Sequence, residues 1–533
     1  MNRVLLALVC AGLLHSAVAA DATTPEWLRY YQMAADAGDP EAQMKIGWAY
    51  DKGDGVARDA ARAVQWYRKA ALQNEPTAQY NLALLLLEGN GVAKDAVTGL
   101  DWLSRAASQN LAVAQNYLAS LYEQGREVPK NDAEAVKWLT RAANKGDAAA
   151  MNNLALKFAN GQGVAKDPAQ ALKWLTAAAQ QGNALAQANL GTVYREGLDG
   201  VTVDYVQAMK WYTAAAQQGN TGAQTKLGWM HLKAQGTAKN LTEAAKWFAL
   251  AAKNGDADAQ TQFGWMAEQG LGMTADPALA AQAYTRAAAQ KNALAASNLG
   301  TLYRDGRGVP ADAIQAVKWF RVAADSGDVN GQYNLAVQLE TYPATEAESL
   351  IWYRKAAEQN LAAAQGRLGW LLLKNASPQE QPGRDSEAAQ WLGKAASQGD
   401  IQAQNNLGVL YDSGRGIEKN PATAAQWYQR AAEAGDAAAQ NNLGVMLRDG
   451  RGVAQNTSQA IEWFKKAAVQ GYSKAMLNLG VMLEQQAKAA PPPAATLPPP
   501  APAAVPPAAK NAPVSTPLAA PAAPVGMPLP AGR

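Results

Sequence analysis

Few side chains in this sequence could act as nucleophiles, metal ligands or proton shuttles. The 533 residues include one cysteine, Cys10, and two histidines, His15 and His231. Disulfide frameworks, thiol catalysis, Cys or His zinc sites and Ser-His-Asp triads need more of these residues than the chain holds. Neither Ser-x-x-Lys nor Gly-x-Ser-x-Gly occurs, and the glycine turns lack the Gly-Lys-Ser/Thr that holds phosphate. The sequence therefore predicts a protein that is not an enzyme and that carries no metal or cofactor.

The carboxylates and the overall charge leave one chemical possibility open and make another improbable. Asp and Glu are plentiful, so a pair of carboxylates suited to glycoside hydrolysis stays open at this stage. Lys plus Arg number 48 against 45 Asp plus Glu, and the two signs are interspersed. Such a chain has no basic patch for nucleic acid or anionic lipid. We expect no nucleic-acid partner.

Residues 1–20 have the features of a secretory signal peptide. A positive charge at Arg3 precedes an apolar run of about a dozen residues, and small residues follow at Ala17, Ala19 and Ala20. We expect cleavage before Ala20 or Asp21, and an exported protein that is periplasmic or secreted. No later segment approaches the length of apolar sequence that spans a bilayer, so no transmembrane segment is predicted. Cleavage would also remove Cys10, which suits an oxidising compartment.

Residues 488–533 form a tail rich in proline and alanine. Residues 491–533 contain 15 of the 26 prolines, and their only charged side chains are Lys510 and Arg533. This composition cannot build a packed core and favours an extended, partly polyproline chain. Two interpretations remain: a spacer or ligand for an aromatic-lined groove on another protein, or a disordered end without a partner.

Between these ends, a segment of the form A-x-x-W-[YFL]-x-x-A-A recurs along the chain. Its aromatic position is spaced by 36 residues, with single steps of 37, 33 and 39. The short and long steps predict irregular connections near residues 341–345 and 376–386. The position is filled by Tyr30, Trp66, Trp102, Trp138, Trp174, Trp211, Trp247, Ala283, Trp319, Trp352, Trp391, Trp427 and Trp463.

Each repeat contains the pattern of two helices, as residues 401–436 illustrate. Ala403, Leu407 and Tyr411 share one face of a first helix, which a glycine turn at 414–417 ends. Asn420 and Pro421 are typical of the cap and first position of a second helix. One helix pair cannot bury its apolar faces alone, but stacked pairs cover one another.

We therefore predict an all-α fold, an α/α superhelical solenoid that spans residues 25–487. It contains about 12 helix-pair repeats of 36 residues and a half repeat at each end. The eleven tryptophans of the repeat position are predicted to be core residues that fill the space between pairs. Truncation of one such residue, for example Trp427→Ala, should then cost about 3–5 kcal/mol.

The pattern A-Q-x-N-L-G-x-x-Y, a G-x-G-V turn and A-x-x-W-Y-x-x-A-A-x-x-G-D resembles the Sel-one-like repeat family, relatives of the tetratricopeptide repeats. Good copies span residues 293–328 and 437–472, and the match covers about 460 residues. The resemblance implies an α/α solenoid that serves as a protein-interaction scaffold. Some relatives carry a disulfide in each repeat, and this chain differs because only Cys10 is present. A family resemblance does not identify the partner.

Helical geometry places two positions of the first helix on a face turned away from its core Leu. At about 100° per residue, the residue before the Leu and the residue two after it lie on the side opposite the Leu. We expect this side to be the groove side of the stack. In the first position eight of thirteen residues are Asn, whose amides could pair with the backbone of an extended peptide or could instead bond the neighbouring helix. In the second position four repeats carry Trp, a typical interface anchor. The candidate binding residues are Trp48, Lys226, Trp229, Gln262, Trp265, Asn298, Asn334, Trp370, Asn406 and Asn442.

The sequence therefore favours an exported, non-enzymatic scaffold or adaptor that binds a protein or peptide along the concave face of the solenoid. Trp229 and Trp265 lie in consecutive repeats and are the best candidate for a binding hot spot, with packing on the adjacent helix as the alternative. Other functions stay open: an envelope or exopolysaccharide assembly factor that stacks Trp on sugar rings of a cell-wall component, a repeat-protein hydrolase, or a plain spacer.

Overall fold

The computed structural model describes residues 25–198, 200–374 and 381–489. These residues form 26 α-helices and one short 3-10 helix. The predicted leader at 1–20 and nearly all of the predicted tail, residues 490–533, lie outside the described residues. Within the described part, no helix is long and apolar enough to span a membrane. The fold class is the predicted all-α helical repeat.

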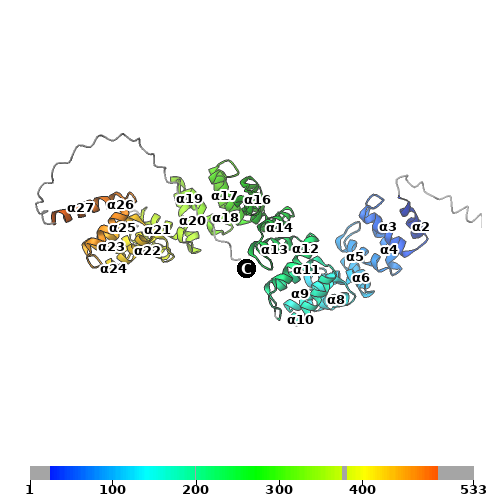
Figure 1. The fold of residues 1–533 in the computed structure, drawn as a ribbon. Coiled ribbons are helices and arrows are strands. Elements are labelled where there is room, and N and C mark those ends of the chain that lie inside the picture. Colours follow the sequence, from blue (N-terminus) through cyan, green and yellow to red (C-terminus); the bar gives the residue numbers. More distant parts are fainter. Residues whose placement is uncertain (1–24, 199, 375–380, 490–533) are drawn as a thin grey trace, which may run out of the picture. The chain divides into compact units, whose positions relative to one another are not determined.

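The helices alternate in chain order between the first and second helix of a repeat (Figure 1). Twelve pairs run from α3 to α26, α2 precedes them as a lone second helix, and α27 follows as a lone first helix. The first helices are α3 (Pro40–Lys52), α5 (Pro76–Glu88), α7 (Ala112–Gln124), α9 (Ala148–Asn160), α11 (Ala184–Glu196), α13 (Thr221–Lys233), α15 (Ala257–Gln269), α17 (Ala293–Asp305), α19 (Val329–Glu340), α21 (Ala362–Lys374), α23 (Ile401–Ser413), α25 (Ala437–Asp449) and α27 (Ser473–Ala489).

The second helices have nearly constant length. They are α2 (Glu26–Asp36), α4 (Ala60–Leu72), α6 (Ala96–Ser108), α8 (Asp132–Asn144), α10 (Pro168–Gln180), α12 (Tyr205–Gln217), α14 (Leu241–Lys253), α16 (Pro277–Ala289), α18 (Ala313–Asp325), α20 (Glu346–Glu358), α22 (Gln381–Ser397), α24 (Pro421–Glu433) and α26 (Thr457–Val469).

The chain divides into two compact units, residues 1–420 and 421–533. In the first unit, which holds α2 to α23, each helix packs against the next one along the chain. Several first helices also contact the next first helix, as α3 does α5, α7 does α9 and α17 does α19. First helices of neighbouring repeats therefore share a layer. The second unit holds α24 to α27, which pack in the same consecutive way.

Caps and glycines define where the helices begin and end. The side chain of Asp276 accepts a hydrogen bond from Leu279 N at the start of α16, and Asp or Asn does the same at most helix starts. First helices usually end at a glycine with positive φ, such as Gly270. The second glycine of the turn meets the previous repeat: a Cβ on Gly272 would lie 2.2 Å from the carbonyl oxygen of Leu241. That approach explains the recurring Gly-x-Gly.

The core lies one residue away from the position that the sequence indicates. The residue after each repeat Trp is buried, with at most 5% exposure, as Phe248 and Phe320 are at 0%. Among the eleven repeat tryptophans, Trp352 and Trp391 are buried and the other nine are half-buried. Trp102 and Trp138 each pack against two neighbouring core clusters. The predicted packing between repeats is thus confirmed, but the prediction of core burial is wrong for nine of them.

The size of the buried residue on the second helix goes with the size of the first-helix residue that faces it. A Cβ on Gly264 would lie 2.7 Å from the Tyr284 ring, so only glycine fits opposite this aromatic residue. In the repeats whose second helix carries Leu103, Leu139 or Leu175, the same first-helix position is alanine. Most helix pairs therefore fill their interior with one of two complementary combinations; the exceptions are Ala336 with Tyr353 in the pair of α19 and α20, and Gly369 with Leu392 in the pair of α21 and α22.

Buried glutamines join consecutive repeats. Gln260 Nε2 donates to the carbonyl oxygen of Ala252 at 3.1 Å, and its Oε1 accepts from Gln290 Nε2 at 2.9 Å. Ten repeats place such a Gln donor on an Ala carbonyl eight residues earlier. Because a buried amide without partners is costly, this relay fixes how one pair stacks on the next.

The two irregular connections occur where the repeat spacing predicts them. Helix α19 is one residue shorter than its counterparts and ends without the usual glycine, and the 3-10 helix η1 (Pro343–Thr345) leads directly into α20. Helix α22 is extended to 17 residues. Residues 375–380, in the lengthened connection, lie outside the described residues.

Candidate ligand-binding face of the first helices

The position two residues after the core Leu is half-buried or exposed on every first helix. Trp48, Leu156 and Val409 are each 42% exposed there, whereas the core Leu residues are buried. We call this row of side chains, together with the residue before each core Leu, the first-helix face. The helical-wheel prediction that these positions point away from the core is confirmed. Apolar side chains thus line an accessible surface.

Trp229 and Trp265 are half-buried at this position on α13 and α15. The Trp229 ring meets the Phe248 ring edge-on, with centroids 5.5 Å apart and an interplanar angle of 85°. Lys233 Nζ lies 5.0 Å from the centroid of the Trp229 ring. Trp265 packs against the clusters around Phe248 and Tyr284. Each ring therefore has a packed side and an accessible side, so packing and binding are compatible.

Trp370 on α21 lies between two cations. Arg367 is 4.3 Å and Lys374 5.0 Å from its ring centroid. Arg367 also bonds Glu340 on α19, with Nε 2.9 Å from Oε2. Burial acts to raise the pKa of Glu340, but hydrogen bonds from Arg367 and Tyr353 outweigh it and lower that pKa. This Trp belongs to a charged cluster that links two repeats.

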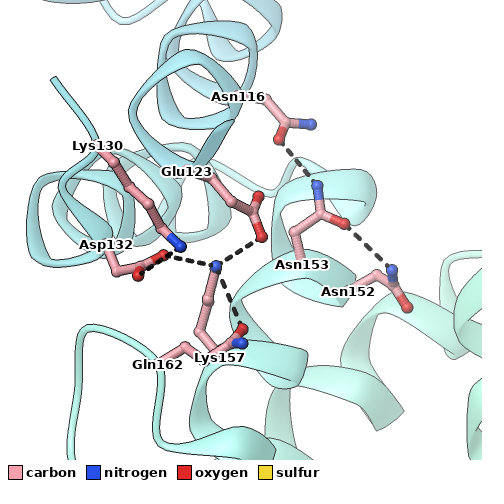
Figure 2. A network of polar contacts seen from close by, with 8 residues as sticks. All are labelled: Asn116, Glu123, Lys130, Asp132, Asn152, Asn153, Lys157 and Gln162. Carbon is pink, nitrogen blue, oxygen red and sulfur yellow. Dashed lines mark hydrogen bonds and ion pairs between the residues drawn. The ribbon is translucent and has the colours of Figure 1, made fainter. Parts of the chain in front are cut away.

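Several asparagines before the core Leu bond the neighbouring first helix. Asn153 Nδ2 donates to Asn116 Oδ1 at 3.1 Å (Figure 2), and Asn189 Nδ2 donates to Asn152 Oδ1 at 2.9 Å. In the second unit, Asn478 pairs with Asn441 at 2.8 Å. For these residues the stacking interpretation is confirmed, because their amides are occupied by the protein itself.

The other predicted site residues lie on the same face without forming one cluster. Asn298, Asn334, Asn406 and Asn442 are half-buried on four different helices, as are Lys226 and Gln262. Burial raises the pKa of Tyr284, and a hydrogen bond with Asn298 partly opposes this shift. Within the described part of the chain, four of these side chains make no hydrogen bond or ion pair: Lys226, Gln262, Asn334 and Asn406.

A buried lysine on α9 is a feature that the sequence analysis missed. Lys157 is 3% exposed, and its Nζ lies 2.6 Å from Glu123 Oε1 and 3.3 Å from Asp132 Oδ1 (Figure 2). These partners come from α7 and α8, so the ion pairs tie two repeats together. The signal is in the sequence, since Leu or Met fills this position in most other repeats.

The repeat tryptophans of the second helices also share an unpredicted feature. Every one of the eleven has a Lys or Arg within 5.9 Å of its ring centroid. The cation comes either from three residues after the Trp, as Lys69 does for Trp66, or from the residue before it, as Lys173 does for Trp174. This alternation is readable in the sequence.

A pocket of about 490 Å³ opens beside Trp48 at the start of the first unit. Its aromatic walls are Trp27 and Tyr31 from α2 and Trp48 from α3. Lys45 Nζ, at the wall, donates to the Tyr31 hydroxyl at 2.9 Å and pairs with Glu41 at 3.4 Å. The full lining is Trp27, Tyr31, Met44, Lys45, Trp48, Asp54, Thr77 and Asn81.

The described residues contain no group of three or more His, Cys, Asp or Glu side chains that could hold a metal ion. His231 is half-buried on α13, and burial lowers its pKa. Its Nδ1 is buried and has no hydrogen-bond partner among the described residues.

Comparison with known proteins supports the repeat assignment. A family model described as the Sel1 repeat matches residues 28–39, 40–75, 76–111, 112–147, 148–183, 184–220, 221–256, 257–292, 293–328, 330–361, 362–400, 401–436 and 437–472. No curated protein sequence matches the chain.

Solved structures similar to this chain include two proteins with the same kind of repeat. A protective antigen present in uropathogenic Escherichia coli, which displays an SLR fold, is 33% identical with a TM-score of 0.72. That match covers 79% of this chain and 90% of the antigen. A Sel1 repeat protein from Oxalobacter formigenes is 30% identical over 60% of this chain and 98% of its own, with a TM-score of 0.47. Since the repeat model matches thirteen segments between residues 28 and 472, the chain belongs to the Sel1 repeat family.

Proposed function

We propose that this protein is an exported adaptor that binds an extended segment of a partner protein on its first-helix face. Sel1 repeat proteins are in general non-catalytic scaffolds that bind proteins. The observation that carries the finer proposal is the juxtaposition of half-exposed Trp229 and Trp265 with the unpaired side chains of Lys226 and Gln262. Aromatic rings supply contact area, and free amide and ammonium groups pair with a peptide backbone.

Export is supported by the leader-like residues 1–20. The similar protein from uropathogenic Escherichia coli is a protective antigen, which agrees with export. N-terminal sequencing of the protein from a cell fractionation tests this part. Recovery of an exported chain that starts at Ala20 or Asp21 supports it, whereas an intact Met1 terminus in the cytoplasm contradicts it.

A photo-crosslinking amino acid at position 226 or 262 tests the binding face. We expect crosslinks to one partner protein in cells, identified by mass spectrometry, and weaker capture when Trp229→Ala or Trp265→Ala is added. Loss of an aromatic anchor at an interface typically weakens binding by roughly thirtyfold or more. The matched control is a crosslinker at position 210, beside Trp211 on a second helix.

The same experiment separates the proposal from its rivals. Equal yields of the same partner from positions 226, 262 and 210 contradict a specific first-helix face. A large drop in melting temperature in either Trp variant assigns those rings to packing alone. Crosslinks to glycan strands rather than protein would favour the envelope-assembly function, in which Trp stacks on sugar rings.

A further inference from the structure

The pocket at the start of the first unit has the character of a polyproline site. Trp27 and Trp48 are 41% and 42% exposed, which is high for such large apolar side chains. The Trp27 ring meets Tyr31 edge-on with centroids 6.0 Å apart, so the two rings of this wall pack against each other. Flat aromatic rings separated by a shallow pocket accept proline rings, whose polyproline helix loses little entropy on binding.

The local backbone also fixes this wall. A Cβ on Gly55 would lie 3.0 Å from Pro25 and 3.2 Å from the Trp27 ring. In the following repeats the equivalent glycine abuts the start of the preceding second helix, as Gly91 does at Ala60. At the N-terminal end the half repeat supplies Pro25 and Trp27 instead. The glycine turn after α3 therefore abuts an aromatic ring and a proline, whereas the turn after α5 abuts helix backbone.

The two charged side chains that line the pocket, Lys45 and Asp54, differ in whether they already have a partner. Lys45 is engaged by Tyr31 and Glu41, and its Nζ lies 4.8 Å from the Tyr31 ring centroid. The carboxylate of Asp54 is exposed and has no hydrogen bond or ion pair with any described residue. The pocket thus combines an apolar, aromatic wall with one lining carboxylate, Asp54, that has no partner among the described residues.

We propose that this pocket binds the proline-rich tail of the protein itself, through residues 498–510. Helix α27 ends at Ala489, and 44 residues follow it in the sequence. Residues 498–510 read PPPAPAAVPPAAK. A polyproline helix has three residues per turn, so Pro507 and Lys510 would share a face of the bound segment. If Pro507 packs on the aromatic wall, Lys510 is then brought close to the carboxylate of Asp54.

The tail also favours this occupant by what it lacks. Residues 491–533 contain no aromatic and no acidic side chain, and only two basic ones. Such a segment has little to gain from the charged turns of other repeats, but its prolines match an aromatic pocket. Binding in trans would link copies of the chain, whereas binding in cis would compete with other ligands of the pocket.

A photo-crosslinking amino acid at Thr77, which lines the pocket without belonging to its aromatic wall, tests the proposal in the full chain. We expect crosslinked peptides from residues 498–510 by mass spectrometry. Replacement of Pro498, Pro499, Pro500, Pro506 and Pro507 by Ser should lower this yield by roughly tenfold or more. These replacements lie outside the folded repeats, so they do not perturb the pocket.

Two finer variants test the charge pairing. Lys510→Gln or Asp54→Asn should lower the crosslink yield by about two- to fivefold, as for an exposed ion pair, and 0.5 M salt should remove most of the difference. The matched control is Arg533→Gln, which should leave the yield unchanged. A yield that rises with protein concentration assigns binding in trans, and a constant yield assigns binding in cis.

The result that overturns the proposal is equally direct. Crosslinks from Thr77 that reach only residues 21–24 or an unrelated protein would give the pocket a different occupant. An unchanged yield in the proline-to-serine variant would also exclude the tail. Neither result bears on Trp229 and Trp265, so the proposed adaptor function stands or falls separately.

Discussion

The tryptophans of the first and second helices occupy different places in the repeat. On second helices Trp recurs in eleven repeats, always beside a cation and next to a buried residue. On first helices only Trp48, Trp229, Trp265 and Trp370 carry Trp at the position two after the core Leu, where other repeats carry Leu, Val, Ser or Thr. The repeat does not need these four rings in order to stack. The recurring tryptophans of the second helices thus serve the scaffold, whereas the four tryptophans of the first helices mark candidate binding sites.

The largest expected effect tests which second-helix residue holds the scaffold together. Phe320→Ala removes a ring with 0% exposure and should cost about 3–5 kcal/mol, whereas Trp319→Ala at the half-buried neighbour should cost only about 1–2 kcal/mol. Denaturant unfolding and hydrogen exchange of α17 to α19 measure both. If Trp319→Ala is as damaging as Phe320→Ala, the distinction between core and edge is wrong.

The contact between the two helices of a pair gives the next effect. Gly264→Ala places a Cβ 2.7 Å from the Tyr284 ring and should cost about 1–3 kcal/mol by overpacking. Adding Tyr284→Leu should recover part of this loss, because it copies the Ala83 and Leu103 combination of another repeat. Gly222→Ala is the control, since its Cβ would meet only Asn220 Oδ1 at 3.5 Å. Additive effects of the two changes would refute the size match.

The sequence predicted the helix pairs, their number and both irregular connections, because apolar spacing and glycine turns are local signals. It misplaced the core by one residue, because Trp and its neighbour differ by only about 100° on the helix and both are apolar. The first-helix face followed from the same geometry. Partners such as Asn116 for Asn153, or Glu123 for Lys157, could not be predicted, since they depend on how one repeat stacks on the next.

Lys157 tests whether a buried departure from the repeat is needed for stability. Lys157→Met restores the residue type of other repeats and should change stability by less than about 1 kcal/mol or raise it, because burying an ammonium offsets its ion pairs. Lys157→Ala should destabilise more, since it leaves a cavity beside Glu123 and Asp132. Thermal unfolding of both variants measures these changes in stability. A strong loss in the Met variant would show that the ion pairs themselves fix the junction.

His231 is a second departure, at a position where other first helices carry Tyr, Phe, Leu or Ala. Burial lowers its pKa below the unfolded value of about 6.5, so the folded state binds fewer protons. The neutral imidazole therefore contributes to the free energy of unfolding. This contribution is fully present above pH 6.5 and is lost as the pH falls through the lowered pKa of the folded state. Among nearby charges, Glu243 opposes the shift and Lys246 adds to it. His231→Leu should flatten the stability profile below pH 6.5, and an unchanged profile would contradict this origin.

The smallest expected effect concerns the cations over the second-helix tryptophans. Lys69 Nζ lies 3.8 Å from the Trp66 ring centroid, and Lys69 is exposed. Lys69→Met keeps the aliphatic stem but removes the charge, so it should cost about 0.5–1 kcal/mol. In the Trp66→Leu background the same change should have no effect, because the ring that attracts the ammonium is gone. A double-mutant cycle measures this coupling. If the coupling is absent, the cations only keep an apolar surface soluble. Their alternation between two sequence positions would then reflect a need for charge near each ring, and not a cation–π interaction with that ring.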